Sequence, residues 1–198
     1  MKETLIIGNH PETLKAAVQI AKLVRDENPV ILSVPFIASL FDLIAPNAVE
    51  IMPIRATDFE STRIGNAIIK TILGVHNSVK QPLTVPQRPI EAAASKLADE
   101  HRNVLILPAG FAHKDLDTQE RWVSGVGKIA RAAYLKNPDI NIALLRIFGY
   151  TRSELSEPIP LKDSGLMPEL TDRPLRDSRE ITANFAKYYN DYFAVGKK

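Results

Sequence analysis

The residue types best suited to chemistry lie near the start of the chain, in Gly8-Asn9-His10-Pro11. An imidazole titrates near neutral pH, so His10 can act as a general base, and the amide of Asn9 can donate a hydrogen bond beside it. Glu12 is a carboxylate close enough along the chain to orient the ring. The same spacing also fits a strand-to-helix turn with a helix cap and, for Glu12, a solvated acid in the first helical turn. Spacing alone leaves both interpretations open.

A second candidate site lies in the run from Leu107 to Lys114, directly after a strand-like stretch. Arg55, earlier in the chain, is a candidate anion clamp, because a guanidinium pairs with phosphate through two parallel hydrogen bonds. For each charged residue of this group the alternative is solvated surface charge, and for the histidine it is a loop position without a role. The candidates within the run are Pro108, Gly110, His113 and Lys114.

The segments that carry these residues alternate between short apolar runs and patterns with helical spacing. This alternation predicts a single α/β domain in which a largely parallel β-sheet is flanked by helices. Because ligand sites in such sheets lie at the carboxyl ends of strands, we expect both candidate sites at that edge. Strands are expected over 5–8, 30–32, 49–54, 103–107 and 141–147. Helices are expected over 12–26, 37–44, 61–73, 90–101, 120–135 and 178–193.

The composition changes near the last quarter of the chain, which predicts two regions within the one domain. Residues 1–150 carry both candidate sites. Residues 151–198 contain a proline-rich excursion and a C-terminal helix that packs on the same domain. We expect Ser178 to cap this helix, with Asp177 or Glu180 near its positive end.

Composition and charge narrow the class of protein. The formal net charge is only +2, so we do not expect the basic stripe of a nucleic-acid-binding protein. The chain has no cysteine, which excludes disulfides, thiolate metal sites and cysteine nucleophiles, and no Asp, Glu and His cluster has the spacing of metal ligands. Because we find neither a secretory signal pattern nor an apolar run long enough to span a membrane, we expect a cytoplasmic protein that can touch a membrane from one side.

Asn9-His10-Pro11 resembles the Asn-His-x-x-x-x-Asp motif of PlsC-type glycerolipid acyltransferases, the 1-acylglycerol-3-phosphate acyltransferase family. In that family the motif follows an early strand, and proline after the histidine is common. The family's histidine deprotonates the acceptor hydroxyl, and its aspartate orients the imidazole. Lys15 occupies the aspartate position in this chain, so the first motif is matched only in part.

Two later segments extend the resemblance. Pro108-Ala109-Gly110 is similar to the family's Phe-Pro-Glu-Gly-Thr-Arg-Ser motif, with Ala109 in place of the glutamate. Residues 122–130 resemble the helix entry that follows that motif. When the proline near Arg55 is aligned with the proline that is frequent in the family, Arg55 lies one residue before the position of the family's phosphate-binding arginine.

The resemblance implies a PlsC-acyltransferase-like fold and transfer of a fatty acyl group from an acyl thioester to a glycerolipid-type hydroxyl acceptor. It implies no resident cofactor, since acyl-CoA or an acyl-carrier-protein thioester is the donor substrate. One alternative is a degenerate member of the same fold that binds an acyl lipid or a phosphorylated ligand without turnover; another is an unrelated α/β module that acts through protein contacts. In the first interpretation the catalytic residues are His10 and Glu12. The substrate-binding residues are Asn9, Arg55, Pro108, Gly110, His113 and Lys114.

Overall fold

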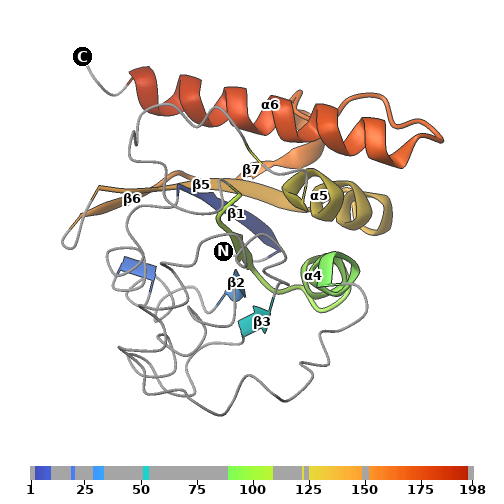
Figure 1. Ribbon diagram of the computed structural model, residues 1–198, viewed down its shortest axis with the longest axis horizontal. Helices are drawn as coiled ribbons and strands as arrows, with labels where there is room; N and C mark the ends of the chain where they lie inside the picture. Colours follow the sequence, from blue (N-terminus) through green and yellow to red (C-terminus); the bar gives the residue numbers. More distant parts are fainter. Residues whose placement is uncertain are drawn as a thin grey trace, which may run out of the picture.

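The computed structural model of the chain has a mixed α/β fold built on one mostly parallel β-sheet (Figure 1), in agreement with the coarse fold class predicted from the alternating pattern. At residues 33, 51–53 and 195 only the backbone is described. The residues that the structure describes are 3–9, 19–20, 29–33, 51–53, 89–108, 122, 125–148 and 152–195.

Five parallel strands form the main part of the sheet, in the order β3-β2-β4-β1-β5. Every residue of β1 and β4 is buried, as expected for parallel strands covered on both faces. This burial explains why their sequences are continuous apolar runs. The strands are β1 (Thr4–Gly8), β2 (Val30–Ser33), β3 (Ile51–Pro53), β4 (Val104–Ile106) and β5 (Asn141–Ile147).

Two short strands extend the sheet in the antiparallel direction. β6 (Ser153–Leu155) pairs with the last residues of β5, and β7 (Ile159–Pro160) pairs with its first residues. A single 3-10 turn, η3 (Leu161–Asp163), follows β7. Among the described residues after 151, β6 and β7 therefore belong to the same sheet as β1 to β5.

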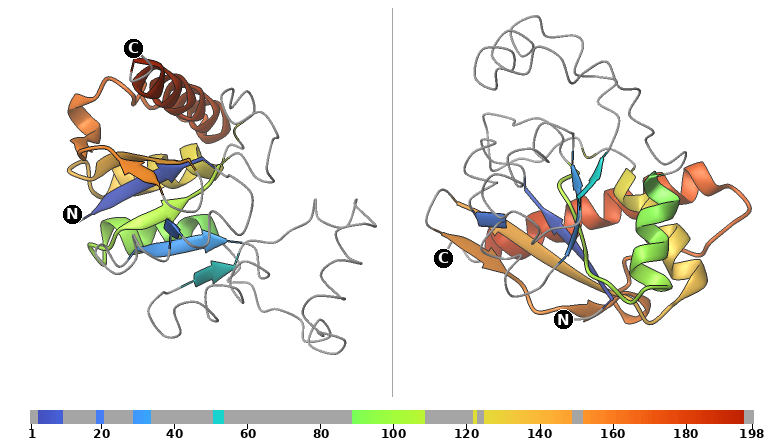
Figure 2. Two further views of the ribbon diagram at one scale, coloured as in Figure 1. Left: turned by 90° about the vertical axis from the view of Figure 1, so that its left-hand side faces the viewer. Right: turned by 90° about the horizontal axis from the view of Figure 1, so that it is seen from below.

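Three helices pack together beside the sheet: α4 (Pro89–Ala98), α5 (Gly125–Lys136) and α6 (Pro174–Val195). α5 contacts both α4 and α6. The views in Figures 1 and 2 show α6 as the outermost helix, lying across α5 and above β5. Among the described residues, no helix combines the length and the apolar character needed to cross a bilayer.

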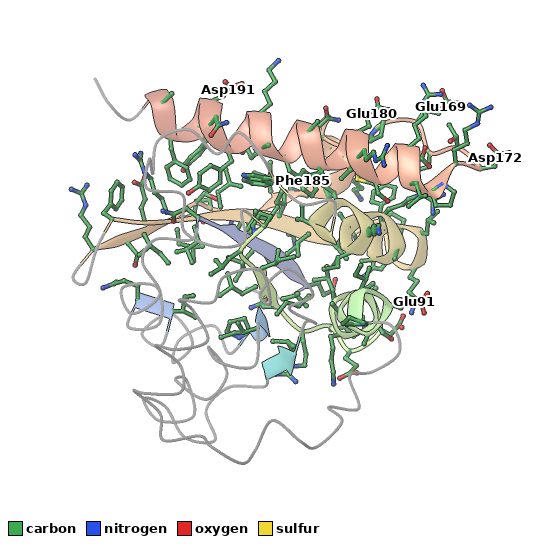
Figure 3. The ribbon with its side chains drawn as sticks, in the orientation of Figure 1. Glu91, Glu169, Asp172, Glu180, Phe185 and Asp191 are labelled. Carbon is green, nitrogen blue, oxygen red and sulfur yellow. The ribbon has the colours of Figure 1, made fainter. Side chains whose placement is uncertain are left out.

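The core of the protein lies between these helices and one face of the sheet. Alternate strand residues such as Leu5 and Ile7 belong to the same buried cluster as Ile129 of α5 and Phe185 of α6. Phe185 is fully buried, and Figure 3 shows its side chain directed from α6 toward the sheet. α5 and α6 approach closely at Gly127, where a Cβ atom would lie only 2.0 Å from a backbone oxygen of α6.

The N-terminus of α6 differs from the prediction. The helix begins at Pro174, not at Ser178, and the hydroxyl of Ser178 donates a hydrogen bond to the carbonyl of Pro174 one turn earlier, at 2.6 Å. Ser178 therefore lies inside the helix, and the prediction that it caps the helix is wrong. Proline suits the first helical position because its missing N–H has no partner there in any case. The hydroxyl of Thr171 instead accepts from the backbone N–H of Arg173, at 3.1 Å.

The other predicted elements are confirmed in type where the structure describes them, but some of their ends differ. All five predicted strands are present, and α4 ends three residues earlier than predicted. α5 begins at Gly125, five residues later than predicted, so Trp122 is not helical. Of the helix predicted over 12–26, residues 19 and 20 are described and both are helical. The helices predicted over 37–44 and 61–73 lie outside the described residues. β6 and β7 were not predicted.

Candidate functional site

Strands β1 and β4 are neighbours that run in the same direction, with Ile7 opposite Ile106. Their carboxyl ends therefore lie at the same edge of the sheet. Asn9 directly follows β1, and Pro108 follows β4 by two residues. The structure thus brings the ends of the two strands that carry the candidate motifs together, as the sequence predicted.

The chain leaves these two strands in opposite directions along the sheet. β1 is followed by β2, beyond β4 on one side, whereas β4 is followed by β5, beyond β1 on the other side. In open α/β sheets, ligands bind in the crevice outside the carboxyl ends of strands where the winding direction reverses. This topology makes the edge at Asn9 and Pro108 the candidate functional site.

Asn9 joins the end of β1 to the end of β5. Its Oδ1 accepts from the backbone N–H of Ile147 at 2.7 Å, and its Nδ2 donates to the carbonyl of Ile147 at 3.0 Å. The backbone N–H of Asn9 donates to the carbonyl of Leu145 at 3.2 Å. The side chain is 4% exposed, so both bonds are shielded from water. The Asn9 amide acts here as an extra peptide group that prolongs the parallel pairing of β1 with β5.

Tyr189 of α6 reaches the same place from the helical layer. Its hydroxyl donates to the carbonyl of Leu145 at 3.1 Å, the same oxygen that accepts from Asn9. Burial raises the pKa of Tyr189 well above its usual range, with the nearby charge of Arg146 opposing this effect. The phenol therefore stays protonated and remains a donor at any physiological pH.

Aromatic rings surround Tyr189. The ring centre of Trp122 lies 5.6 Å from that of Tyr189, and the two rings meet edge-on. The ring centre of Phe193 lies 4.7 Å from that of Tyr189. These distances are typical of attractive aromatic pairs. We call Trp122, Tyr189 and Phe193 the aromatic wall. It is built by the segment that follows β4 and by the C-terminal half of α6.

The guanidinium group of Arg146 lies beside the aromatic wall. Arg146 of β5 donates to the carbonyl of Phe193 at 3.2 Å, and its Cζ atom lies 5.4 Å from the centre of the Phe193 ring. It also lies 4.7 Å from the ring centre of Phe148, which Arg152 approaches to 4.8 Å. Phe148 is 39% exposed. The edge of the sheet beyond β5 therefore combines aromatic faces with two cations.

The structure describes only part of the predicted site. Asn9 and Pro108 are both buried at the carboxyl edge, and the bonds of Asn9 to Ile147 show that its amide has a structural role. Their predicted contacts with substrate stay predictions. The remaining predicted residues lie outside the described residues: His10, Glu12, Arg55, Gly110, His113 and Lys114.

Sequence reasoning did not identify the aromatic wall or Arg146. Tyr189 and Phe193 are spaced four residues apart on a helix, which is the ordinary signature of a core-facing stripe. The available signal was the concentration of aromatic residues in the last two turns, together with the single tryptophan of the chain. Neither signal indicates that the stripe meets the end of β5 beside Asn9.

Other features of the described chain do not compete with this edge. No group of three or more His, Cys, Asp or Glu side chains among the described residues could hold a metal ion. A hollow of about 480 Å³ lies at the beginning of α6, away from the aromatic wall at the other end of that helix. It is open to solvent, and its lining residues are Arg173, Pro174, Leu175, Arg176 and Arg179.

Comparison with known proteins adds no relative to this picture: the chain matches no protein-family model, and no curated protein or solved structure is significantly similar to it.

Proposed function

We propose that this chain is an acyltransferase-like protein of PlsC-like fold that moves a fatty acyl group from an acyl thioester to a glycerolipid-type hydroxyl acceptor. His10 accepts the proton of the acceptor hydroxyl as its oxygen attacks the thioester carbonyl carbon. The tetrahedral adduct then expels the thiolate, the C–S bond breaks, and the proton passes from the imidazole to the sulfur. An ester and a free thiol result, and no resident cofactor takes part.

The observation that carries the proposal is the adjacency of β1 and β4. The Asn-His and Pro-x-Gly segments are far apart in sequence, yet the strands that they follow are paired and end at one edge. Two motifs that act on one substrate require such an arrangement. The topology adds support, because the winding direction of the sheet reverses between these two strands.

The proposal is tested by incubating the purified chain with radiolabelled palmitoyl-CoA and either lysophosphatidate or glycerol 3-phosphate, and by measuring labelled ester. We expect ester formation by the natural chain and a loss of at least about 100-fold in His10→Ala, the usual contribution of general-base catalysis. His101→Ala is the matched control, because His101 is exposed near the opposite end of β4. Transfer that survives in His10→Ala would refute the assignment of the base.

A second candidate function is binding without turnover. It is favoured by Lys15 and Ala109, which occupy the positions at which the PlsC-type family has its two carboxylates. A lysine cannot orient an imidazolium in the way that an aspartate does, because both groups are cationic. Native mass spectrometry of the purified chain distinguishes the two functions: a co-purified acyl lipid with no transferase activity supports binding alone. Transfer that appears only in the double variant Lys15→Asp, Ala109→Glu would support the same conclusion.

We also propose that the protein is cytoplasmic and touches membranes peripherally, since the acylated product is a lipid. Flotation with liposomes of phosphatidylcholine and phosphatidate tests the contact. Recovery of the chain in the floating fraction is the expected result, and a chain that stays at the bottom of the gradient at low salt contradicts it.

A further inference from the structure

The indole N–H of Trp122 is a buried hydrogen-bond donor for which the described structure provides no acceptor. Its Nε1 atom is shielded from solvent and has no hydrogen-bond partner among the described residues. Leaving such a donor unpaired in a buried place is destabilising. Most buried polar groups in folded proteins have partners, so each exception calls for an explanation, such as an interaction made only when a ligand is bound.

The surroundings of Trp122 place this donor close to the candidate site. The ring contacts Tyr189, whose hydroxyl is bonded to the carbonyl of Leu145. Leu145 lies opposite Gly8 at the carboxyl end of β1. Three contacts in series therefore connect the indole to Gly8, the residue that precedes Asn9.

The chemistry of this wall defines the ligand that it fits. The ring of Tyr189 contacts those of Trp122 and Phe193, and the guanidinium of Arg146 lies against Phe193. Tyr189 and Phe193 are buried, whereas Trp122 is only partly buried. Aromatic surface favours an apolar chain, whereas an indole N–H can only donate a hydrogen bond. A ligand that satisfies both features has an apolar chain and an oxygen acceptor at one end of it.

We propose that Trp122 is a ligand-binding residue whose indole N–H donates to the carboxylate or carbonyl oxygen of an amphiphile with an aliphatic chain. The chain of the amphiphile packs against the partly exposed ring of Trp122, the outer member of the aromatic wall. This inference rests on the proposed function only in placing the ligand at the carboxyl edge of the sheet, and it requires no turnover. Because Nε1 is shielded from solvent, binding requires a local movement at Trp122 that uncovers this atom.

The single tryptophan of the chain makes a direct test possible. Protein labelled with ¹⁵N at tryptophan gives one indole cross-peak, which is followed while sodium decanoate is added. We expect the indole proton to move downfield as it gains an acceptor. Decyltrimethylammonium has the same chain without an oxygen acceptor, so it should leave the indole proton without that downfield shift. An indole resonance that is unchanged when calorimetry shows decanoate binding to be saturated would overturn the proposal, and so would the absence of any decanoate binding.

Variants provide an independent measurement by calorimetry. Trp122→Phe keeps an aromatic ring but removes the donor, so we expect decanoate to bind at least about tenfold more weakly, the effect of one lost hydrogen bond. Tyr188→Phe is the matched control, because it removes a hydroxyl one residue before Tyr189 on the same helix and outside the aromatic wall. Equal affinity of Trp122→Phe and the natural chain would overturn the proposal.

The result is separable from the proposed transfer reaction. His10→Ala is expected to lose ester formation and to keep the decanoate-dependent shift of Trp122. If transfer is absent from the natural chain but the shift is present, the acyltransferase proposal fails and the ligand site stands. If transfer is present but the shift is absent, the acyltransferase proposal stands and the proposal that Trp122 binds the ligand fails.

Discussion

Gly127 provides a test of the packing between α5 and α6, because two physical effects predict opposite signs for its replacement. Alanine is the better helix former, by up to about 1 kcal/mol. However, a Cβ atom at Gly127 would lie 2.0 Å from the carbonyl oxygen of Ser178 and 2.5 Å from the hydroxyl of Thr182. An ordinary carbon–oxygen contact is about 3.3 Å or longer, so the backbones of the two helices would have to separate by roughly 1 Å.

The magnitude follows from this overlap. Overpacking a dense core costs about 1–3 kcal/mol, and the obstacle here is backbone, which cannot rotate away. We therefore expect Gly127→Ala to lower the free energy of unfolding by about 1–2 kcal/mol after the gain in helix propensity. Gly125, two residues earlier in α5, has no atom within 4 Å of its Cβ position. Gly125→Ala should accordingly be neutral or more stable by up to about 1 kcal/mol.

Urea unfolding followed by far-ultraviolet circular dichroism measures both variants. For a urea dependence of about 2 kcal/mol per molar, the midpoints of Gly127→Ala and Gly125→Ala should differ by about 0.5–1.5 M. If Gly127→Ala is as stable as Gly125→Ala, helix propensity is the dominant effect. The close approach of α5 and α6 would then be incorrect.

Two further predictions concern buried polar side chains. Asn9→Leu should lower the free energy of unfolding by about 2–4 kcal/mol, because it leaves the N–H and carbonyl of Ile147 unpaired in a buried place; thermal denaturation measures this, and a change below about 0.5 kcal/mol would contradict the two hydrogen bonds. Burial of the Asp177 carboxyl raises its pKa, but bonds from Thr171 and Arg131 outweigh this effect, so its pKa is lowered below 3.8 in the folded protein. A carboxyl whose pKa is lowered by folding stabilises the fold at pH values above its unfolded pKa, and this stabilisation is lost as the pH falls through its folded pKa. The excess stability of the natural chain over Asp177→Asn should therefore be full above about pH 5 and should shrink below pH 4. An excess that is constant from pH 7 to pH 2 would refute the ion pair.

The strands of the parallel sheet were predictable because burial on both faces leaves a simple pattern. β1, β4 and the middle of β5 are buried, so each contains a run of apolar residues (5–7, 104–106 and 142–145). β6 and β7 have no such pattern. They are two to three residues long and partly exposed, and β7 contains a proline, which in a sequence indicates a break in regular structure. Their pairing depends on the position of β5, and proline is tolerated because β7 lies outside the main path of the sheet.

The beginning of α6 could not be located from local preferences alone. Ser178 is a good capping residue by type, and the helical pattern is strong after it. The helix begins earlier because the carboxylate of Asp177 accepts from both the N–H and the hydroxyl of Thr171 and pairs with Arg131 of α5. These bonds hold the turn before Pro174 against another helix. The bond between Arg131 and Asp177 joins residues 46 positions apart, so no local window contains this information.

The candidate site was predictable to the extent that it depends on the ends of strands. Residues that follow a buried strand lie at the edge of a parallel sheet, and this rule alone placed Asn9 and Pro108 at one edge. The aromatic wall depends on a different fact, the crossing of α6 over the end of β5. Tyr189 and Leu145 are 44 residues apart, and their contact follows from helix packing that the sequence pattern does not specify.

The Asn-His pair therefore combines two different roles in adjacent positions. Asn9 bonds to Ile147 of β5, and its backbone and Tyr189 share one carbonyl, so its amide is needed by the sheet before any substrate binds. Substitution of Asn9 should consequently reduce stability and activity together. Substitution of His10, the proposed base, should reduce transfer while the free energy of unfolding stays nearly unchanged. Two adjacent residues of one motif can thus serve the fold and the chemistry separately, and only paired measurements of stability and transfer separate them.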